Sequence, residues 1–541
     1  MKVLISGAGV AGLTLAHWLT RHGITPTVVE KAPAIRVGGY KVDIRGAALD
    51  VVRSMGILDE LRRLRTDVRT GSVVDTTGKR VASMDADTFG GRVHDDAEVL
   101  RGDLLRVLFE LTRESADYRF GDSIVALDDS RVTFASGRVE EFDVVVGADG
   151  THSVTRALAF GPEEHFIRDL GHRIAIFSVP NHLKLDREEL TYISPGRTAL
   201  VYSTARDATL KAMFLFTNTG SEEVDTDSGE VSDGTGEIGT GSGEIGTGSG
   251  EVSTGTGEVG DPAGSRKGDT PAGSVESRDP ATQKAALRRA YAAEGWEVPR
   301  LLDGLDDTPD FYCDAIAQVH MERWSTGRVV LLGDAAHCAS PASGQGTSLA
   351  LVGGYLLAHE LATAAAAART ASTATSGSGS ATASNSAATS NSTSTTASNS
   401  AATSDSASVA ASGFAVAADS ATATVSGSVA APDVAFTSGG ATASDSVSTA
   451  ASRGAAASGF ALGDLATAFL AYEERMRPFA LRNQELGPAN IKRMVMRTRG
   501  QVRMSMVMLR LMAHLPGRDR LMAKVIEPIH RAANAIELPE R

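Results

Sequence analysis

The first 31 residues, MKVLISGAGVAGLTLAHWLTRHGITPTVVEK (Met1–Lys31), read as a strand, a tight turn, a helix and a second strand. Lys2–Ser6 is a short apolar run of the kind that a buried parallel strand requires. It leads directly into G-x-G-x-x-G, in which Gly7 permits the turn, Gly9 lets the backbone approach a pyrophosphate, and Gly12 lets the helix pack closely on the strand. The stretch therefore predicts a unit that binds a dinucleotide.

The segment after the glycines supports the same interpretation. We expect a helix over Leu13–Arg21, with its partly positive N-terminus directed at the phosphates. The next strand, Thr27–Val29, ends at Glu30, about 20 residues after the glycines, where a carboxylate can accept a hydrogen bond from a ribose hydroxyl. The alternative is a strand-helix turn with a purely structural role, and the complete strand, glycine, helix and strand context favours binding.

Two long tracts differ in composition from the rest of the chain. Residues 219–282 are rich in Gly, Ser, Thr and Glu, and residues 363–462 are rich in Ala, Ser and Thr. Neither tract offers an apolar face that could offset the entropy of ordering its backbone, so both are predicted to be disordered inserts. Without them the core comprises roughly 380 residues, enough for two packed domains.

The formal net charge of −13 is concentrated in the first insert. Residues 219–282 hold 14 acidic and three basic residues, a net −11, which leaves about −2 for the remainder. A nearly neutral core predicts no nucleic-acid partner, and the acidic tract is interpreted as a solvated spacer rather than a binding face.

Other features of the sequence indicate the cellular compartment of the protein. Cys313 and Cys338 are the two cysteines of the chain, which predicts no disulfide framework and fits a reducing cytoplasm. The apolar run at the N-terminus is short and broken by glycines, so we do not expect a signal peptide. No apolar run reaches about 18 residues, so no stable membrane insertion is expected.

Two further segments place polar residues at the ends of buried strands. Phe142–Gly147 is a buried strand followed by Ala148, Asp149 and Gly150, and Asp149 could cap the next turn or meet a ligand. In the second segment, Val329–Leu332 delivers Asp334 to the end of another strand. Pro341 stiffens the following loop, and Gly344 and Gly346 let its backbone approach a flat ligand.

Several side chains admit two interpretations. His337 and Cys338 raise the possibility of a metal site or a nucleophile, but no further ligands stand at metal spacing and no orienting base is evident, so neither is predicted. The alternating segments between Ile174 and Phe216 predict an antiparallel sheet whose aromatic face is either core or a wall for an apolar substrate. Methionines and arginines interleave between Met494 and Met512, which favours a packed helix with a basic face over a membrane-surface helix.

Three motifs in this order resemble the single-component flavin monooxygenases typified by para-hydroxybenzoate hydroxylase: G-A-G-V-A-G from Gly7, G-A-D-G from Gly147, and G-D-A-A-H from Gly333 followed by P-x-x-G-x-G. Within that family, residues 36–46 and L-R-G-D-L-L-R-V-L from Leu100 are most similar to the tetracycline-degrading monooxygenases and their actinobacterial relatives. The resemblance spans nearly the whole core. It departs from the family pattern after G-x-G, where Val352-Gly353-Gly354 replaces the usual acidic residue.

The resemblance implies an α/β fold in which a Rossmann-like FAD-binding domain is interleaved with an α+β substrate domain built on an antiparallel sheet, followed by a C-terminal helical segment. The expected ranges are 1–70, 98–165 and 311–362 for the FAD-binding domain, 71–97, 166–218 and 283–310 for the substrate domain, and 463–541 for the C-terminal helices.

The resemblance also implies the cofactor and its site. FAD is expected at the N-terminal glycines and Glu30, with Asp43 and Arg101 near the cofactor and Asp334 at its pyrophosphate and ribitol. Arg36 matches the position linked to NADPH in the family, and NADPH or NADH would dock transiently because no second dinucleotide unit is found. The full set of predicted cofactor-binding residues is Gly7, Gly9, Gly12, Glu30, Arg36, Asp43, Arg101, Asp149, Asp334, Pro341, Gly344 and Gly346.

The implied activity is that of an FAD-dependent monooxygenase. NAD(P)H would reduce the flavin, and O2 would then form a flavin C4a-hydroperoxide that hydroxylates an apolar or aromatic small molecule, polycyclic ones included. No indispensable acid or base is expected, and His172 or Tyr202 would serve only if a substrate phenol must be deprotonated. The protein is expected to be a cytoplasmic monomer or weak dimer without a metal.

Three alternatives stay open. A flavin-dependent halogenase of the same fold would carry a Trp-x-Trp-x-Ile-Pro motif, and this chain has only Trp296-Glu297-Val298-Pro299. A flavin reductase or dehydrogenase that does not use oxygen is poorly excluded by sequence. The third alternative is a flavin-bound scaffold tethered to partners by the inserts.

Overall fold

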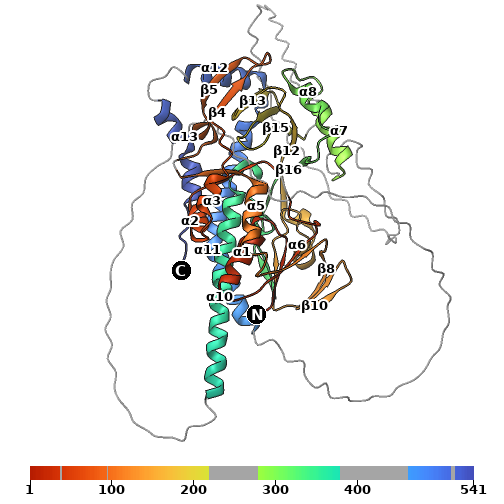
Figure 1. Cartoon of the computed structure of the whole chain (residues 1–541), viewed down its shortest axis with the longest axis vertical. Helices are drawn as coiled ribbons and strands as arrows, with labels where there is room; N and C mark the ends of the chain where they lie inside the picture. Colours follow the sequence, from red (N-terminus) through yellow and green to blue (C-terminus); the bar gives the residue numbers. More distant parts are fainter. Residues whose placement is uncertain (37–38, 94, 219–277, 378–460, 513–517, 541) are drawn as a thin grey trace, which may run out of the picture.

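The computed structural model describes residues 1–36, 39–93, 95–218, 278–377, 461–512 and 518–540 (Figure 1). Most of the two predicted inserts, 219–282 and 363–462, lies outside the described residues. Their described edges correct the predicted boundaries. Helix α10 (Gly346–Gly377) continues past residue 363 because a run of alanines favours helix, and helix α7 (Pro280–Ala290) begins within the predicted insert, where the Asp279 carboxylate accepts the Thr282 N–H.

A six-stranded sheet is built around the N-terminal strand β1 (Val3–Ser6), in the order β17-β18-β11-β1-β2-β7. Every neighbouring pair is parallel except β17 and β18. The carboxyl ends of β1, β2, β11 and β18 therefore meet at one edge of the sheet. The other strands are β2 (Thr27–Glu30), β7 (Asp117–Phe120), β11 (Val144–Gly147), β17 (Ser325–Thr326) and β18 (Val329–Leu331).

Both faces of this sheet are covered, which explains the continuous apolar runs of its strands. On one face α1 (Val10–Arg21) packs against α10 and α5 (Arg101–Glu110). Gly354 of α10 permits this approach, because a Cβ there would lie 3.0 Å from the Leu15 backbone nitrogen. The opposite face packs against a three-stranded sheet of β8 (Ile124–Asp128), β9 (Arg131–Phe134) and β10 (Val139–Glu141) and is flanked by α6 (Val154–Phe160).

A seven-stranded sheet forms the second layer system, in the order β16-β12-β15-β14-β13-β4-β5. Its pairs are antiparallel except β13 and β4, and α7 and α8 (Val298–Asp303) cover its outer face. The parallel and antiparallel sheets together confirm the predicted α/β fold class. The strands are β4 (Thr70–Val74), β5 (Arg80–Asp85), β12 (Ile167–Pro180), β13 (Glu188–Ser194), β14 (Arg197–Tyr202), β15 (Thr209–Thr217) and β16 (Tyr312–Val319).

Strand β16 lies at the start of residues 311–362, which were predicted to belong to the FAD-binding domain, and that boundary stays a prediction. β16 is an edge strand of the seven-stranded sheet and pairs with β12 through, for example, Ala175 and Cys313. Its sequence, YCDAIAQV, is that of a strand, but nothing in it indicates which sheet it joins.

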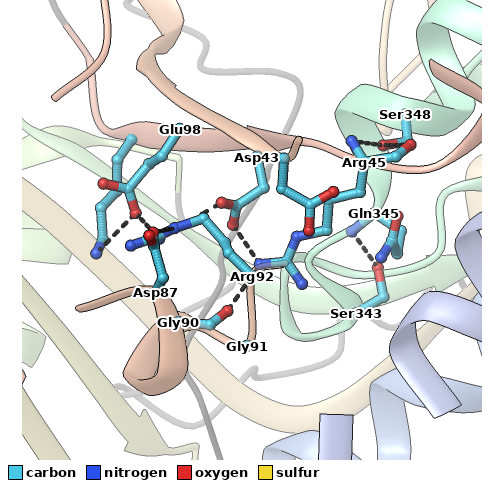
Figure 2. Close-up of polar contacts among 12 residues, drawn as sticks. Asp43, Arg45, Asp87, Gly90, Gly91, Arg92, Glu98, Ser343, Gln345 and Ser348 are labelled. Carbon is cyan, nitrogen blue, oxygen red and sulfur yellow. Dashed lines mark hydrogen bonds and ion pairs between the residues drawn. The ribbon is translucent and has the colours of Figure 1, made fainter. Parts of the chain in front are cut away.

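A two-stranded ribbon of β3 (Lys41–Ile44) and β6 (Ala97–Leu100) carries a buried ion cluster (Figure 2). Lys41 Nζ lies 3.1 Å from a Glu98 carboxylate oxygen and also pairs with Glu189 of β13. The Arg92 guanidinium bridges Glu98 and Asp43. All five side chains are nearly excluded from solvent, so the cluster ties the ribbon to the seven-stranded sheet.

The C-terminal helices and several short helices complete the fold. Helix α11 (Leu462–Met494) packs along α10, and α12 (Arg499–Met512) lies against β5 and β13. Figure 1 shows α12 and α13 at the end of the molecule that holds β4 and β5. The short elements and the last helix are α2 (Ala47–Ser54), α3 (Leu58–Arg63), α4 (Ala86–Gly90), η1 (Glu163–His165), α9 (Asp334–His337), η2 (Pro341–Ser343) and α13 (Arg518–Ala533).

One segment, residues 346–370 of α10, is long and apolar enough by composition to cross a membrane. Its most apolar stretch is 72% buried inside the protein, where it packs against α1 and α11. This burial is typical of a core helix. The sequence interpretation had not singled out the segment because His359 and Glu360 interrupt its apolar run.

The reversal of the chain between β1 and α1 yields a first prediction. A Cβ on Gly12 would lie 2.0 Å from the Gly7 carbonyl oxygen, so Gly12→Ala should lower the free energy of unfolding by about 2 to 3 kcal/mol. Urea denaturation of the FAD-free protein measures the change. The matched control is Gly23→Ala, which has a φ of +74° but nothing within 4 Å of its Cβ and should cost only about 1 kcal/mol. Equal losses would contradict the steric explanation.

The ion cluster yields a second prediction. Burial alone would raise the pKa of Glu98, but Lys41 and Arg92 hold it at about 2, below the unfolded value of about 4.3. The cluster therefore stabilises the fold above pH ~4, and this contribution is lost as the pH falls from about 4 toward 2. Glu98→Gln should lower the free energy of unfolding at neutral pH by about 3 kcal/mol.

Urea denaturation over a pH series tests this assignment. The difference between Glu98→Gln and the parent should shrink as the pH falls below about 4, because Glu98 of the parent then takes up a proton. The control is Glu114→Gln, whose carboxylate is 85% exposed and which should not change stability. A difference that is independent of pH would contradict the role of the charge.

Candidate functional site

A pocket opens where β1, β2 and β11 end. It is lined by backbone from Gly7 and Gly9, by Glu30 at the end of β2, and by Asp149 after β11. The meeting of these segments follows from the parallel order of the strands, since neighbouring carboxyl ends share one edge.

The start of helix α1 makes this pocket suited to an anion. Gly9 is the N-cap residue, and the helix has neither a side-chain cap nor an acidic residue in its first turn. The N–H groups of that turn and the positive end of the helix dipole are therefore available for a phosphate. Gly12 lies one turn further on and packs against Gly7.

The Glu30 carboxylate is fixed by backbone donors. One oxygen accepts the Ala8 N–H and the other accepts the Ala32 N–H, each at 2.9 Å. Each oxygen keeps a lone pair, so the carboxylate can accept hydrogen bonds from the two hydroxyls of a ribose. The glycine turn and Glu30 thus fit the ADP half of FAD.

Cationic side chains surround the same pocket. Lys31, Arg36 and Arg101 line it. Burial lowers the pKa of Lys31, and the nearby Arg36 lowers it further, which indicates a crowded positive environment. Arg101 is the first residue of α5, and its backbone N–H donates to the Tyr40 carbonyl at 2.9 Å.

Asp149 has a structural partner as well as a place in the pocket. Its carboxylate accepts the Ser153 hydroxyl and both the N–H and hydroxyl of Thr155, so it fastens the first turn of α6. Arg156 in that turn is fully buried and donates to the Ala335 and Thr151 carbonyls. The G-A-D-G motif therefore joins β11 to α9, and a direct contact between Asp149 and the cofactor stays a prediction.

The second motif lies beside the first. Gly333, with a φ of +64°, turns the chain from β18 into α9, and a Cβ there would lie 2.9 Å from the Ala11 Cβ. Asp334 consequently starts α9 next to the first turn of α1. This position fits the predicted role of Asp334 near the pyrophosphate, which stays a prediction.

The loop after α9 is held from several sides. Ser340 (φ +82°) and Gly344 (φ +66°) set its shape around Pro341. The Asn490 side chain of α11 donates to the Ala342 carbonyl at 3.0 Å, and Gln318 of β16 donates to the Ala339 carbonyl at 3.2 Å. The loop thus has a fixed backbone supported by both the seven-stranded sheet and α11.

Gln345 stands at the end of this loop, between Gly344 and Gly346 (Figure 2). Its side chain is fully buried, and neither of its amide atoms has a hydrogen-bond partner among the described residues. A buried amide without partners is costly, so the site is suited to a ligand that has both donors and acceptors on its edge. A flat polar ring such as the isoalloxazine of FAD meets this requirement.

The other predicted residues lie away from the pocket. Asp43 belongs to the buried ion cluster, where it pairs with Arg45 at 2.9 Å. Tyr202 is buried, its hydroxyl accepts the Lys41 N–H, and burial raises its pKa well above the ordinary value, which favours the protonated phenol. The ring of His172 donates from Nδ1 to the Leu170 carbonyl, and burial lowers its pKa.

The described residues contain no cluster of His, Cys, Asp and Glu side chains that could hold a metal ion. His337 is buried against Trp324, and burial lowers its pKa to about 4. Burial also raises the pKa of Cys338 well above the ordinary value, so its thiol is a poor nucleophile.

Sequence reasoning missed three residues that shape the site: Arg45, Arg156 and Gln345. Arg45 is fully buried; its backbone N–H donates to the Ser348 hydroxyl in the first turn of α10, and its guanidinium donates to the Gly90 carbonyl (Figure 2). A signal for Arg45 was present, because Lys41 and Asp43 alternate along β3 and Arg45 continues the same spacing directly after the strand. Nothing in sequence marks Gln345 as unpaired.

Comparisons with known proteins show the family to which the chain is related. The family model described as an FAD binding domain matches residues 1–171 and 312–389. An uncharacterized protein of Mycobacterium tuberculosis is 39% identical over 365 residues, covering 66% of this chain and 84% of that protein. A flavin-dependent monooxygenase from an unknown prokaryotic organism is 34% identical over 365 residues, covering 67% of this chain and 80% of that protein.

Solved structures share the fold. The crystal structure of tetracycline destructase Tet(55) superimposes with a TM-score of 0.61 at 26% identity, covering 100% of this chain and 98% of that chain. The pocket at the sheet edge, the family model and these relatives lead to one conclusion: the chain belongs to the FAD-dependent monooxygenases and has the fold of para-hydroxybenzoate hydroxylase.

Proposed function

We propose that this FAD-dependent monooxygenase consumes NAD(P)H to hydroxylate an apolar or aromatic small molecule, polycyclic ones included. The single observation that carries the proposal is the pocket in which the uncapped start of α1 and the doubly anchored Glu30 face the same space. When bound, FAD supplies the chemistry by accepting a hydride and then activating O2.

The chain's own residues hold and orient the cofactor in this proposal. The first turn of α1 binds the pyrophosphate, Glu30 binds the ribose, and Asp334 lies beside the pyrophosphate and ribitol. Gln345 and the loop from Pro341 to Gly346 border the flavin ring. The bracing of that loop by Asn490 and Gln318 keeps the ring position constant.

The substrate class is supported by the inner face of the seven-stranded sheet. Ile174, Ile176, Met213 and Leu215 point away from α7 and α8 and join the same core cluster as Tyr40 beside the FAD-binding part. The aromatic face, with Phe177, Phe214 and Phe216, packs under α7 and α8 and is ordinary core. An apolar face on the side of the FAD-binding part suits an apolar substrate, and Tet(55) is named for acting on tetracycline, a polycycle.

Two features support a transient nicotinamide co-substrate. Lys31, Arg36 and Arg101 line the pocket beside the carboxylates of Glu30, Asp122 and Asp149, and their cationic groups can bind a phosphate-bearing nucleotide. In the part of the chain that the structure describes, a G-x-G-x-x-G turn between a strand and a helix occurs once, and FAD occupies it in our proposal. We therefore place the reduced nicotinamide near Arg36 without a domain of its own.

The proposal includes no indispensable acid or base from the protein. The role of the protein in this proposal is to position the substrate and exclude water. Burial favours the protonated phenol of Tyr202 and the neutral ring of His172, so His172 is the better proton acceptor of the two if a substrate phenol must be deprotonated. The two free, buried cysteines fit the reducing cytoplasm that we propose as its location, and we propose a monomer or weak dimer.

Glu30→Gln tests the cofactor assignment. The substitution removes the charge that a ribose hydroxyl would meet and breaks one of the two anchoring hydrogen bonds, so the Kd for FAD should rise about tenfold to a hundredfold. Titration of the FAD-free protein with FAD, followed by quenching of flavin fluorescence, measures it. The exposed carboxylate variant Glu114→Gln should bind FAD like the parent. An unchanged Kd for Glu30→Gln would contradict the site.

Reduction and reoxidation test the activity. The FAD-loaded protein should be bleached by NADPH without oxygen, and mixing with oxygenated buffer should then give a short-lived absorbing species before the oxidised flavin spectrum returns. A product that carries oxygen from labelled O2 would identify a hydroxylase. Reoxidation without any such species, and without oxygenated product from a broad aromatic panel, would favour the reductase alternative.

A further inference from the structure

Helix α12 presents two apolar faces, and among the described residues one of them packs against the core. Val502, Met506 and Leu509 point inward and pack against the core. On the opposite side Met504, Val507, Met508 and Leu511 are 72%, 53%, 46% and 61% exposed. Their spacing of three, four and seven residues places all four on one helical stripe. Scattered exposed apolar residues are ordinary, but four in one stripe mark a binding surface.

Arginines border this stripe. Arg499, Arg503 and Arg510 are spaced by four and seven residues, so they form a second exposed row beside the apolar one. The chain holds seven lysines and arginines between Glu485 and Asp519 and no acidic residue in that interval, although its formal net charge is −13. This interval of the chain is thus cationic in an acidic protein, and Asp75 is an acidic neighbour of its Arg510.

The fold holds the outer face of α12 away from the core. Just before the helix, the Met496 carbonyl accepts the Gly196 N–H at 2.7 Å, and the Met494 carbonyl accepts the Thr198 hydroxyl. Helix α12 then lies against β5 and β13. Figure 1 shows it at the end of the molecule beyond β4 and β5, opposite the end that holds β8 and β10. The stripe is consequently a fixed, outward surface.

We propose that α12 docks this protein on an anionic phospholipid bilayer, with the apolar stripe at the boundary of headgroups and acyl chains and the arginine row on the lipid phosphates. An amphipathic helix that is cationic on its polar side has the composition of an interfacial anchor. A second copy of the chain fits less well, because two copies would bring like-charged rows together. Docking would place the seven-stranded sheet, to which we assign the substrate, beside the bilayer, where apolar molecules concentrate.

Sedimentation with vesicles tests the proposal on the full-length, FAD-loaded protein. It should bind vesicles of phosphatidylcholine mixed with phosphatidylglycerol, bind phosphatidylcholine alone much more weakly, and lose binding as salt is raised. The double variant Met504→Glu and Leu511→Glu should lose at least tenfold in vesicle affinity. Arg503→Gln should lose about fivefold, the effect of one basic residue near an anionic surface.

Leu470→Glu is the matched control. Leu470 is 58% exposed on α11, outside the stripe, so this variant adds one of the two negative charges of the double variant to another exposed apolar site and should bind vesicles like the parent. Retained flavin content and melting temperature show that each variant is folded. Absence of vesicle binding would overturn the proposal, as would equal binding by the double variant. A dimer in light scattering that the double variant abolishes, without vesicle binding, would assign the stripe to a second copy.

Discussion

The reversal of the chain after β1 is the constraint on which the other features depend. The Gly7 carbonyl oxygen lies where a Cβ of residue 12 would stand, so α1 can approach β1 only through a glycine. That approach aims the helix at the sheet edge, brings α10 against α1 at Gly354, and lets Gly333 rest on Ala11. The close contact therefore places the start of α1, Glu30 and Asp334 along one edge.

The residues at this edge of the sheet could be predicted from the sequence, because each of four parallel strands is followed by a motif of its own. The glycines follow β1, Glu30 ends β2, Asp149 follows β11 and Asp334 follows β18. Strand ends follow from local pattern, and the parallel order brings them together. Local pattern failed where long-range pairing decides. It did not assign β16 to its sheet, and it gave no sign that Asp43 pairs with Arg45 and Arg92, while the place of Asp43 near the cofactor stays a prediction.

The site is completed by segments far apart in the chain. Gln484 of α11 donates to the Val319 carbonyl at 2.7 Å, at the end of β16, while Asn490 supports the loop that carries Gln345. The loop is therefore shaped only once the seven-stranded sheet and α11 are both in place. A sequence gives no distances between segments. The hydrogen bonds that support this loop, and the lack of a partner for the Gln345 side-chain amide among the described residues, could therefore not be predicted.

The two cysteines have a consequence for chemical labelling. Cys313 lies on β16 of the seven-stranded sheet, where burial raises its pKa to about 12, and Cys338 lies in the second cofactor motif with its pKa raised as well. Both thiols are buried and unpaired, so alkylating reagents reach them only when the surrounding structure opens. Alkylation of Cys313 therefore reports local opening of the seven-stranded sheet, and alkylation of Cys338 reports local opening around the second cofactor motif.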